Sequence, residues 1–364
     1  MPVKYTNTIK GAKEMKKILS KWAVVGLAVG LLAACGNEDA APGGEEAAAG
    51  GGTDGKPTYA MVFKNTGNPY GEKMMDGFEE AIKEAGGEVI LRAPDQPTAE
   101  GQIQIVEQLI TQQVDSILIT GNDIDALQPV LEKAMDAGIK VLSADSAVNP
   151  ESRMVHVNQA DPELIGRTQI QAVSEMIDGE GQIAVLSATS QAANQNLWIE
   201  WMKKELEKPE YENIELVKVA YGDDLRDKST SEAEALLLQY PDLKAIVSPT
   251  TVGIAAAGKV LTDKGLAGKV ILTGLGLPSE MATYIENGVS PAMFLWNPID
   301  VGYGAGMTAV ALVEGDITGA LGETFEAGRL GEKEIVEDGE GTQVMLGEPF
   351  RFDKDNIGEW KEVY

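Results

Sequence analysis

The sequence has very little cysteine and histidine, with one residue of each among 364. A single cysteine excludes an intramolecular disulfide framework and a cysteine-rich zinc site. A single histidine leaves little from which to build a metal centre or a histidine-dependent catalytic triad. These shortages point away from an enzyme, and we expect no metal or other cofactor.

Positive charge is also scarce, because 30 lysine and arginine residues face 57 aspartates and glutamates, a formal net charge of -27. A chain with this charge repels the phosphates of nucleic acids and of anionic lipids, so no nucleic-acid partner is expected. The composition is still that of a folded protein. With 43% apolar residues, the chain can bury one large or two ordinary hydrophobic cores.

The longest apolar run, WAVVGLAVGLLAA, follows a lysine-rich segment and ends just before Cys35. At about a dozen residues it is short for a membrane span of roughly 20, and it is typical of a secretion signal. Leu32-Ala33-Ala34-Cys35 resembles the lipobox of bacterial lipoproteins. The resemblance implies a signal peptide at 1–34, lipidation of Cys35 and an extracytoplasmic protein anchored to a bacterial membrane.

Residues 35–57 consist largely of glycine, alanine and acidic residues, which predicts a flexible acidic tether. Within it, GGGTDGK has the spacing of a phosphate-binding loop. No strand pattern precedes this segment, and Pro57 stands where a metal-binding serine or threonine is required and blocks the helix that should follow. We therefore interpret the segment as linker.

From Tyr59 onward, short β-rich runs alternate with amphipathic helical patterns, such as 71–86, where Met74, Phe78 and Ile82 share one face. Nearly continuous apolar strands joined by helices predict parallel sheets covered on both faces, and about ten such units predict two similar lobes. The expected strands are YAMVF at 59, DSILIT at 115, KVLSAD at 140, VHVN at 155, QIAVLSA at 182, ELVKVAYG at 215, LKAIVSP at 243, VILTGLG at 270 and AMFLW at 292.

Polar and aromatic residues follow many of these strands, and in open α/β sheets ligands bind outside the carboxyl ends of the strands. Carboxylates, amides and a lysine can hydrogen-bond neighbouring hydroxyls, and aromatic faces pack on the C–H side of a sugar ring. The pattern therefore favours a small polyol as ligand. The candidate ligand-binding residues at the strand ends are Lys64, Tyr70, Asn122, Asp123, Asp145, Asn194, Gln195, Pro249, Thr250, Thr251, Trp296 and Asn297.

Each of these positions has a purely structural alternative. Turns and helix N-caps also use asparagine, aspartate and threonine, so Asn122, Asp123, Asp145, Asn194 and Thr250 suit a cap as well as a ligand contact. Lys64 is harder to explain in this way, because a cation at the end of a buried strand needs an anionic partner or ligand oxygen. Three further residues are expected in the core or between lobes: His156, Trp198 and Trp201.

Several stretches together resemble the type I periplasmic-binding-protein family, the sugar-binding components of ABC importers. The segments FKNTGNPYGEKMMDGFEEA and VLSADSAVNPESR carry this resemblance, with the lipobox and the tether. Five longer segments most resemble the rhamnose-binding proteins of this family: LSATSQAANQNLWIEWMKK, YGDDLRDKSTSEAEALL, VSPTTVGIAAAGKV, TGLGLPSEMATYIENG and FLWNPIDVGY. The resemblance implies two α/β lobes joined by a multi-strand hinge, a deoxyhexose such as L-rhamnose as ligand, permease and ATPase partner subunits, and a monomer.

The related autoinducer-2 receptors bind a furanosyl signal with a lysine, an aspartate, an Asp-Gln pair and a Pro-x-Ala loop. This pattern falls on Lys64, Asp145, Asn194-Gln195 and Pro249-Thr250-Thr251. An asparagine here replaces the second carboxylate, and Thr251 replaces the alanine. Because a pocket that hydrogen-bonds particular hydroxyls rejects ligands that lack them, both changes favour a sugar. For a sugar ligand, the family resemblance adds Phe63 to the candidates as an aromatic wall. Autoinducer-2 stays the alternative ligand.

We expect the chain to cross between the lobes near Asn158, Gly276 and Glu326. The N-terminal lobe then comprises 58–158 and 277–326, and the C-terminal lobe comprises 159–276 and 327–364. Ligand binding between such lobes selects a closed form that the importer recognises.

Two other classes of protein share parts of this pattern. A sugar-responsive repressor would begin with a basic helix-turn-helix, where this chain has a signal and an acidic tether. An α/β enzyme acting on a sugar stays open as a second alternative. The sequence has no G-x-S-x-G turn, no complete G-x-G-x-x-G motif, and only His156 to pair with a nucleophile.

Overall fold

The computed structural model describes residues 55–364. The predicted signal peptide, Cys35 and nearly all of the predicted tether lie outside these residues. In chain order the helices and strands are β1 (Thr58–Val62), α1 (Pro69–Glu84), β2 (Glu88–Arg92), α2 (Ala99–Gln112), β3 (Ser116–Ile119), α3 (Gln128–Asp136), β4 (Lys140–Ala144), β5 (His156–Asn158), α4 (Pro162–Met176), β6 (Gly181–Ser187), α5 (Ala193–Leu206), β7 (Ile214–Tyr221), α6 (Arg226–Gln239), β8 (Leu243–Ser248), α7 (Thr251–Asp263), β9 (Ile271–Gly274), α8 (Pro278–Glu286), β10 (Ala292–Leu295), α9 (Pro298–Glu314), β11 (Thr324–Glu326), β12 (Glu332–Asp338), β13 (Gly341–Met345), β14 (Phe350–Asp353) and α10 (Ile357–Trp360).

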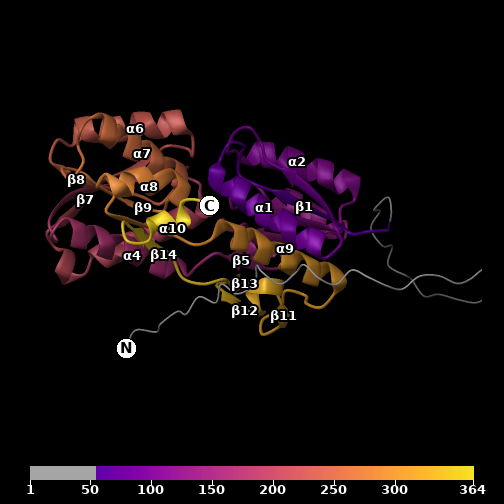
Figure 1. Ribbon diagram of the computed structural model, residues 1–364. Coiled ribbons are helices and arrows are strands. Elements are labelled where there is room, and N and C mark those ends of the chain that lie inside the picture. The colour runs from indigo at the N-terminus through magenta and orange to yellow at the C-terminus, as the bar shows by residue number, and fades with distance from the viewer. Residues whose placement is uncertain (1–54) are drawn as a thin grey trace, which may run out of the picture. The chain divides into compact units, whose positions relative to one another are not determined.

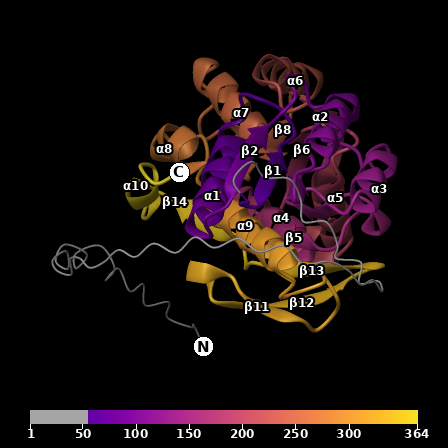
Figure 2. The same ribbon diagram turned by 90° about the vertical axis from the view of Figure 1, so that its right-hand side faces the viewer.

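The first lobe is built on an eight-stranded sheet in the order β11-β12-β13-β5-β4-β3-β1-β2. The pairings among β1 to β5 and between β13 and β5 are parallel, whereas β12 pairs with β11 and β13 in antiparallel fashion. Helices cover both faces of the sheet, with α1 and α9 on one and α2 and α3 on the other (Figure 1, Figure 2). The lobe therefore has the expected helix-sheet-helix layering, with an antiparallel extension at one edge.

Because both faces of β1 are buried, the first charged residue of this segment comes only after the strand ends. Tyr59 and Met61 belong to the core that includes α1 and α9, whereas Ala60 and Val62 belong to the core that includes α2 and α3. Because successive strand residues point to opposite faces, both sets are buried and the strand is apolar throughout. Lys64 is the first charged residue after β1, and so it lies at the carboxyl end of the sheet.

Glycines allow α1 and α9 to cross in close contact. A Cβ atom on Gly77 would lie 1.9 Å from the carbonyl oxygen of Ile299, and a Cβ atom on Gly302 would lie 1.8 Å from that of Met74. Both distances are far below van der Waals contact, so a larger residue at either position would have to displace a helix. The contact holds the middle of α1 against the N-terminal end of α9, and the first residues of both helices lie next to the candidate site.

The second lobe contains a four-stranded parallel sheet in the order β7-β6-β8-β9. Helices α4 and α5 cover one face, where Ile183 and Val185 of β6 pack with Val173 and Ile199. Helices α6, α7 and α8 lie on the other face (Figure 1). Strands β10 and β14 form a separate antiparallel pair, and an isolated bridge between Leu275 and Phe294 joins β10 to the end of β9.

Within residues 55–364 the chain crosses between the lobes after β5, after β10 and after β13. The first crossing follows Asn158, but the strand pairing differs from the predicted division at the other two. Residues 277–295 lie in the second lobe, because β10 is bridged to the end of β9 and α8 packs against α7. Residues 327–345 lie in the first lobe, because β13 pairs with β5. The predicted boundaries near Gly276 and Glu326 are therefore corrected to the ends of β10 and β13.

Candidate ligand-binding site

The carboxyl ends of strands from both lobes meet around one pocket, whose open space of about 370 Å³ is partly exposed to solvent. Most of the predicted site residues line it: Phe63, Lys64, Tyr70, Asp145, Asn194, Gln195, Pro249, Thr250, Thr251 and Trp296. The other lining residues are Asn68, Trp198, Asp224, Leu275 and Leu295.

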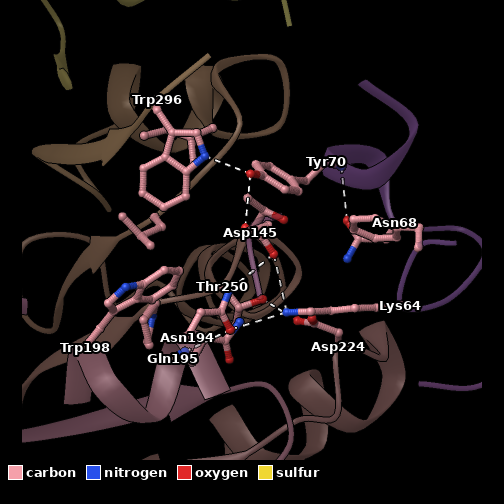
Figure 3. Close-up of a pocket in the computed structure, with 15 residues that line it drawn as sticks. Lys64, Asn68, Tyr70, Asp145, Asn194, Gln195, Trp198, Asp224, Thr250 and Trp296 are labelled. Carbon is pink, nitrogen blue, oxygen red and sulfur yellow. Dashed lines mark hydrogen bonds and ion pairs between the residues drawn. The ribbon is translucent and has the colours of Figure 1, made fainter. Parts of the chain in front are cut away.

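Lys64 and Asp145 form a buried ion pair within the pocket (Figure 3). Lys64 follows β1 and Asp145 follows β4, and the Lys64 Nζ atom lies 3.5 Å from Asp145 Oδ2. Both side chains are only 7% exposed, so each charge depends on the other or on polar groups of a ligand. Asp145 also has a φ of 60°, in the left-handed region that few residues other than glycine occupy. Backbone strain of this kind is concentrated at ligand-binding sites.

Asn194 connects the two lobes across the pocket (Figure 3). It lies in the first turn of α5, where its Oδ1 accepts a hydrogen bond from Lys64 Nζ at 3.3 Å and its Nδ2 donates to Asp145 Oδ2 at 3.2 Å. A carboxylate at this position would repel Asp145, whereas the amide can accept from a cation and donate to a carboxylate. The neighbouring Gln195 accepts hydrogen bonds from the end of β6 through its Oε1, which directs the amide group.

Asp224 is a lining carboxylate that the sequence analysis did not select. It follows β7, is 8% exposed, and accepts a hydrogen bond from the Thr250 hydroxyl. Burial raises the pKa of its carboxyl group, Lys64 and Thr250 partly offset this, and the charge of Asp145 raises it further. Its φ of 52° is also left-handed. The rule that selected the other strand ends applies here too, because Asp223 and Asp224 follow β7 after a single glycine.

Four aromatic rings pack around the polar groups. Ring centroids are 6.5 Å apart for Phe63 and Tyr70, 6.4 Å for Tyr70 and Trp296, and 5.7 Å for Trp296 and Trp198. Trp296 Nε1 donates to the Tyr70 hydroxyl at 2.7 Å, and this hydroxyl donates to Asp145 Oδ1 at 3.2 Å. Burial and the charge of Asp145 raise the pKa of Tyr70 well above its usual value, so the hydroxyl keeps its proton. Trp198, expected in the core, is buried and also lines the pocket.

Of the remaining lining residues, one could have been predicted from the sequence and two could not. Asn68 caps α1, because its Oδ1 accepts hydrogen bonds from the backbone of Tyr70 and Gly71. It stands in the polar segment after β1 and could have been selected. Leu275 follows β9 and Leu295 ends β10, and both are almost fully buried. No sequence signal distinguishes such leucines from ordinary core residues.

The structure places Asn122, Asp123 and Asn297 outside this pocket. Asn122 donates from Nδ2 to the carbonyl oxygen of Lys64 at 2.8 Å, and so holds the backbone behind the site. Asp123 accepts hydrogen bonds from backbone amides two and three residues later, as in a turn. Asn297 accepts from the backbone of Ile299 and caps α9. At these three positions the turn and cap alternative describes what the side chains do.

His156 and Trp201 both lie outside the pocket. His156 lies in β5, is 2% exposed and is 2.9 Å from the Ser143 hydroxyl, with its pKa lowered by burial and by Arg153. Trp201 lies outside the pocket, beneath the cations of Arg167 and Lys204. Between residues 55 and 364, no cluster of three or more potential ligands could hold a metal ion, and no helix is long and apolar enough to cross a membrane.

Comparisons with known proteins agree with this architecture. The family model for the periplasmic binding protein domain matches residues 59–317. An ABC transporter solute binding protein from Clostridium phytofermentas, solved with bound L-rhamnose, is 46% identical, with a TM-score of 0.83 over 85% of this chain and 99% of that chain. LsrB from Clostridium saccharobutylicum, in complex with AI-2, shares the fold, with 22% identity and a TM-score of 0.79 over 83% of this chain and 99% of that chain. The D-ribose/D-allose-binding protein of Pseudomonas aeruginosa is 26% identical over 61% of this chain and 71% of its own length.

These matches confirm the predicted fold class of two α/β lobes with parallel sheets covered on both faces. The family model alone extends over more than half of the chain. The protein therefore belongs to the periplasmic binding protein family with the type I fold, to which the sugar-binding components of ABC transporters belong.

Proposed function

We propose that this protein is the lipid-anchored binding component of an ABC sugar importer and that it binds a deoxyhexose such as L-rhamnose between its lobes. The observation that carries the proposal is the network of Lys64, Asn194 and Asp145, which joins both lobes inside a pocket lined by aromatic rings. The relative from Clostridium phytofermentas, which holds L-rhamnose, supports the choice of sugar.

The pocket offers the donors and acceptors that a small polyol needs. Lys64, Asn194 and Gln195 supply N–H donors, whereas Asp145 and Asp224 supply carboxylate acceptors. The rings of Phe63, Tyr70, Trp198 and Trp296 offer faces on which the C–H groups of a sugar ring can pack. We assign the ligand contacts to this set, together with the Pro249-Thr250-Thr251 loop.

Closure of the lobes follows from where these groups originate. Lys64 and Asp145 belong to the first lobe and Asn194 to the second, so a ligand that contacts all three is held only when the lobes lie close together. Such a ligand shifts the population toward the closed form by its additional contacts there. We propose that the permease receives the sugar from this closed form, and that the binding protein acts as a monomer.

Calorimetric titration of the detergent-purified full-length protein tests the proposed ligand. We expect one-to-one binding of L-rhamnose and weaker binding of L-fucose, D-ribose, D-xylose and autoinducer-2. Lys64→Met and Asp145→Asn should each lower the affinity at least about 10-fold, because each leaves a buried partner without its hydrogen bonds. The matched controls are Lys259→Met and Asp263→Asn, which break an exposed ion pair on α7 and should leave the affinity unchanged.

The same titration separates the alternatives. Heat with autoinducer-2 and none with L-rhamnose would make the protein an autoinducer-2 receptor, despite the amide at Asn194 and the hydroxyl at Thr251. Chemical conversion of the recovered sugar would indicate an enzyme, since a binding protein returns its ligand unchanged. If both control variants also lost binding, the loss in Lys64→Met and Asp145→Asn could not be assigned to ligand contacts in the pocket.

The lipid anchor is tested separately from sugar binding. Cells that produce the full-length protein are labelled with radioactive palmitate, and the purified protein is examined for the label. We expect the wild type to be labelled and to stay with the membrane after a high-salt wash, whereas Cys35→Ser should carry no label. A labelled Cys35→Ser protein, or an unlabelled wild type, would contradict lipidation at this position.

A further inference from the structure

One wall of the pocket is lined mainly by apolar atoms. It is formed by the side chains of Leu275, Leu295, Trp198 and Trp296, and we call it the leucine wall. All four are buried, with exposed fractions between 1% and 7%. Figure 3 shows the two tryptophans on one side of the site, across from Lys64 and Asp224.

We propose that the leucine wall is a methyl subsite, which receives the C6 methyl group of a 6-deoxy sugar and disfavours hexoses with a hydroxyl at C6. The proposal rests on the proposed function and goes further, because it assigns one substituent of the ligand to one part of the pocket. It also names which chemical feature of the sugar the protein selects.

The strand ends distinguish this wall from the rest of the site. Strands β1, β4 and β7 are followed by the charged residues Lys64, Asp145 and Asp224, whereas β9 is followed by Leu275 and β10 ends in Leu295. At the ends of β9 and β10, the pocket therefore presents leucines where β1, β4 and β7 present charged groups. A ligand that fills the pocket must place its least polar part against them.

The polar atom of Trp296 does not change this conclusion. Its Nε1 donates to the Tyr70 hydroxyl at 2.7 Å and is therefore already paired. The two leucine side chains have no donor or acceptor at all. A hydroxyl group placed against the two leucines would lose its bonds to water and gain none from them, whereas a methyl group would be transferred from water to an apolar surface.

A series of three sugars tests this reasoning directly, because L-lyxose, L-rhamnose and L-mannose have the same ring stereochemistry. They differ only in the substituent at C5, which is hydrogen, methyl or hydroxymethyl. Burial of one methyl group should make L-rhamnose bind at least about 4-fold more tightly than L-lyxose. The unpaired hydroxyl should make L-mannose bind on the order of 10- to 100-fold more weakly than L-rhamnose.

The experiment is calorimetric titration of the detergent-purified full-length protein with each of the three sugars. Leu295→Asn has nearly the same shape but adds an amide that can pair with the C6 hydroxyl, so the preference for L-rhamnose over L-mannose should fall at least about 5-fold. Leu295→Met keeps the wall apolar and should retain the preference. The matched control is Leu238→Asn, on an exposed leucine of α6, which should also retain it.

The wild-type series decides the outcome even if Leu295→Asn does not fold. If L-mannose binds within about 2-fold of L-rhamnose, the methyl subsite is refuted while the proposed function stands. A preference for L-rhamnose that survives in a folded Leu295→Asn protein would place the selection elsewhere and also overturn this assignment. If none of the three sugars binds, the proposed function fails and the subsite fails with it.

Discussion

A buried glutamate holds the helix that carries much of the candidate site. The loss of folding free energy expected on its substitution follows from its pKa. Glu205 lies near the C-terminal end of α5, the helix that carries Asn194, Gln195 and Trp198. Its side chain is completely buried, yet it accepts hydrogen bonds from Arg167 at 2.5 Å, Lys208 at 2.8 Å and Gln171 at 3.1 Å. Because two of these donors belong to α4, the carboxylate fastens α5 to its neighbour.

The pKa of Glu205 sets the size of this contribution. Burial raises the pKa, but the hydrogen bonds from Lys208, Arg167 and Gln171 outweigh it and lower the pKa from 4.5 to about 2. A depression of this size corresponds to about 3 kcal/mol of folding free energy at neutral pH. Lys208 and Arg167 are 41% and 24% exposed, so hydration of the two cations reduces their net contribution. We therefore expect Glu205→Gln to lower the free energy of unfolding by about 2 kcal/mol at pH 7.

The sign of the pH dependence follows from the direction of the shift. A carboxyl group with a lowered pKa stabilises the folded state above the pKa of the unfolded chain and loses this effect as the pH falls toward the folded pKa. The difference between wild type and Glu205→Gln should therefore be complete above about pH 5, fall to less than half by about pH 3 and nearly vanish at about pH 2. Other acidic groups titrate in both proteins and cancel in the difference.

Urea unfolding followed by tryptophan fluorescence measures this difference. Trp198, Trp201 and Trp360 all belong to the second lobe, so their emission reports on the lobe that contains Glu205. The control is Glu200→Gln on the same helix, whose exposed side chain should contribute less than about 0.5 kcal/mol. A difference between wild type and Glu205→Gln that stays constant from pH 7 to pH 2 would refute the assignment to an ionised, hydrogen-bonded carboxylate.

Three further predictions concern the site and its supports. Asp224→Asn should raise the melting temperature at pH 7 while weakening sugar binding at least about 10-fold. The reason for the stability gain is that a carboxyl group with a raised pKa is most favourable in the folded state when protonated, and its stabilising effect is lost as pH rises. Asp223→Asn is the control, and a lower melting temperature in Asp224→Asn would contradict the reasoning. Gln159 follows β5 at the first crossing, and both polar atoms of its side chain are buried with no partner among residues 55–364. Gln159→Leu should therefore raise the free energy of unfolding by about 1 kcal/mol in urea unfolding, and an unchanged or lower value would argue against this reasoning. Gly302→Ala should lower the free energy of unfolding, measured by urea unfolding, by about 3 kcal/mol, because its Cβ would overlap the Met74 carbonyl. Gly358 has open space around it, so Gly358→Ala is the control and should leave the free energy of unfolding unchanged.

The fold was predictable from the sequence because the central strands of both sheets are apolar on both of their faces. Runs such as YAMVF and QIAVLSA coincide with β1 and β6, since strands buried on both sides have no polar residue until they end. The edge strand β2 was not predicted, because its half-buried residues mix charge and apolar character. The crossings after β10 and β13 were misplaced for another reason: α8 and β10 form a strand-and-helix unit that would fit either sheet, and lobe membership depends on pairing between distant segments.

The candidate site was predictable at positions where a charged residue follows a buried strand. Lys64 stood out because a cation ends a buried strand, whereas Asp145 suited a helix cap equally well in the sequence. The structure pairs the two. Asn122 and Asn297 look the same in the sequence but hold backbone groups, and the choice between cap and ligand contact depends on three-dimensional direction. Leu275 and Leu295 carry no sequence signal at all. Their role emerges only when the other walls of the pocket are known to be polar.

If the pocket binds a sugar as proposed, the hydrogen bonds inside it determine which hydroxyl pattern it accepts. Lys64, Asn194, Asp145, Tyr70 and Trp296 form a continuous chain of donors and acceptors that satisfy one another. A ligand hydroxyl that enters this chain must replace a bond that already exists, so it gains affinity only if it donates and accepts in the same order. A sugar with one inverted hydroxyl leaves a buried partner unpaired, which costs far more than the loss of an average contact. On the proposed function, selectivity among sugars therefore depends on the polar chain, whereas selectivity for a deoxy carbon depends on the leucine wall.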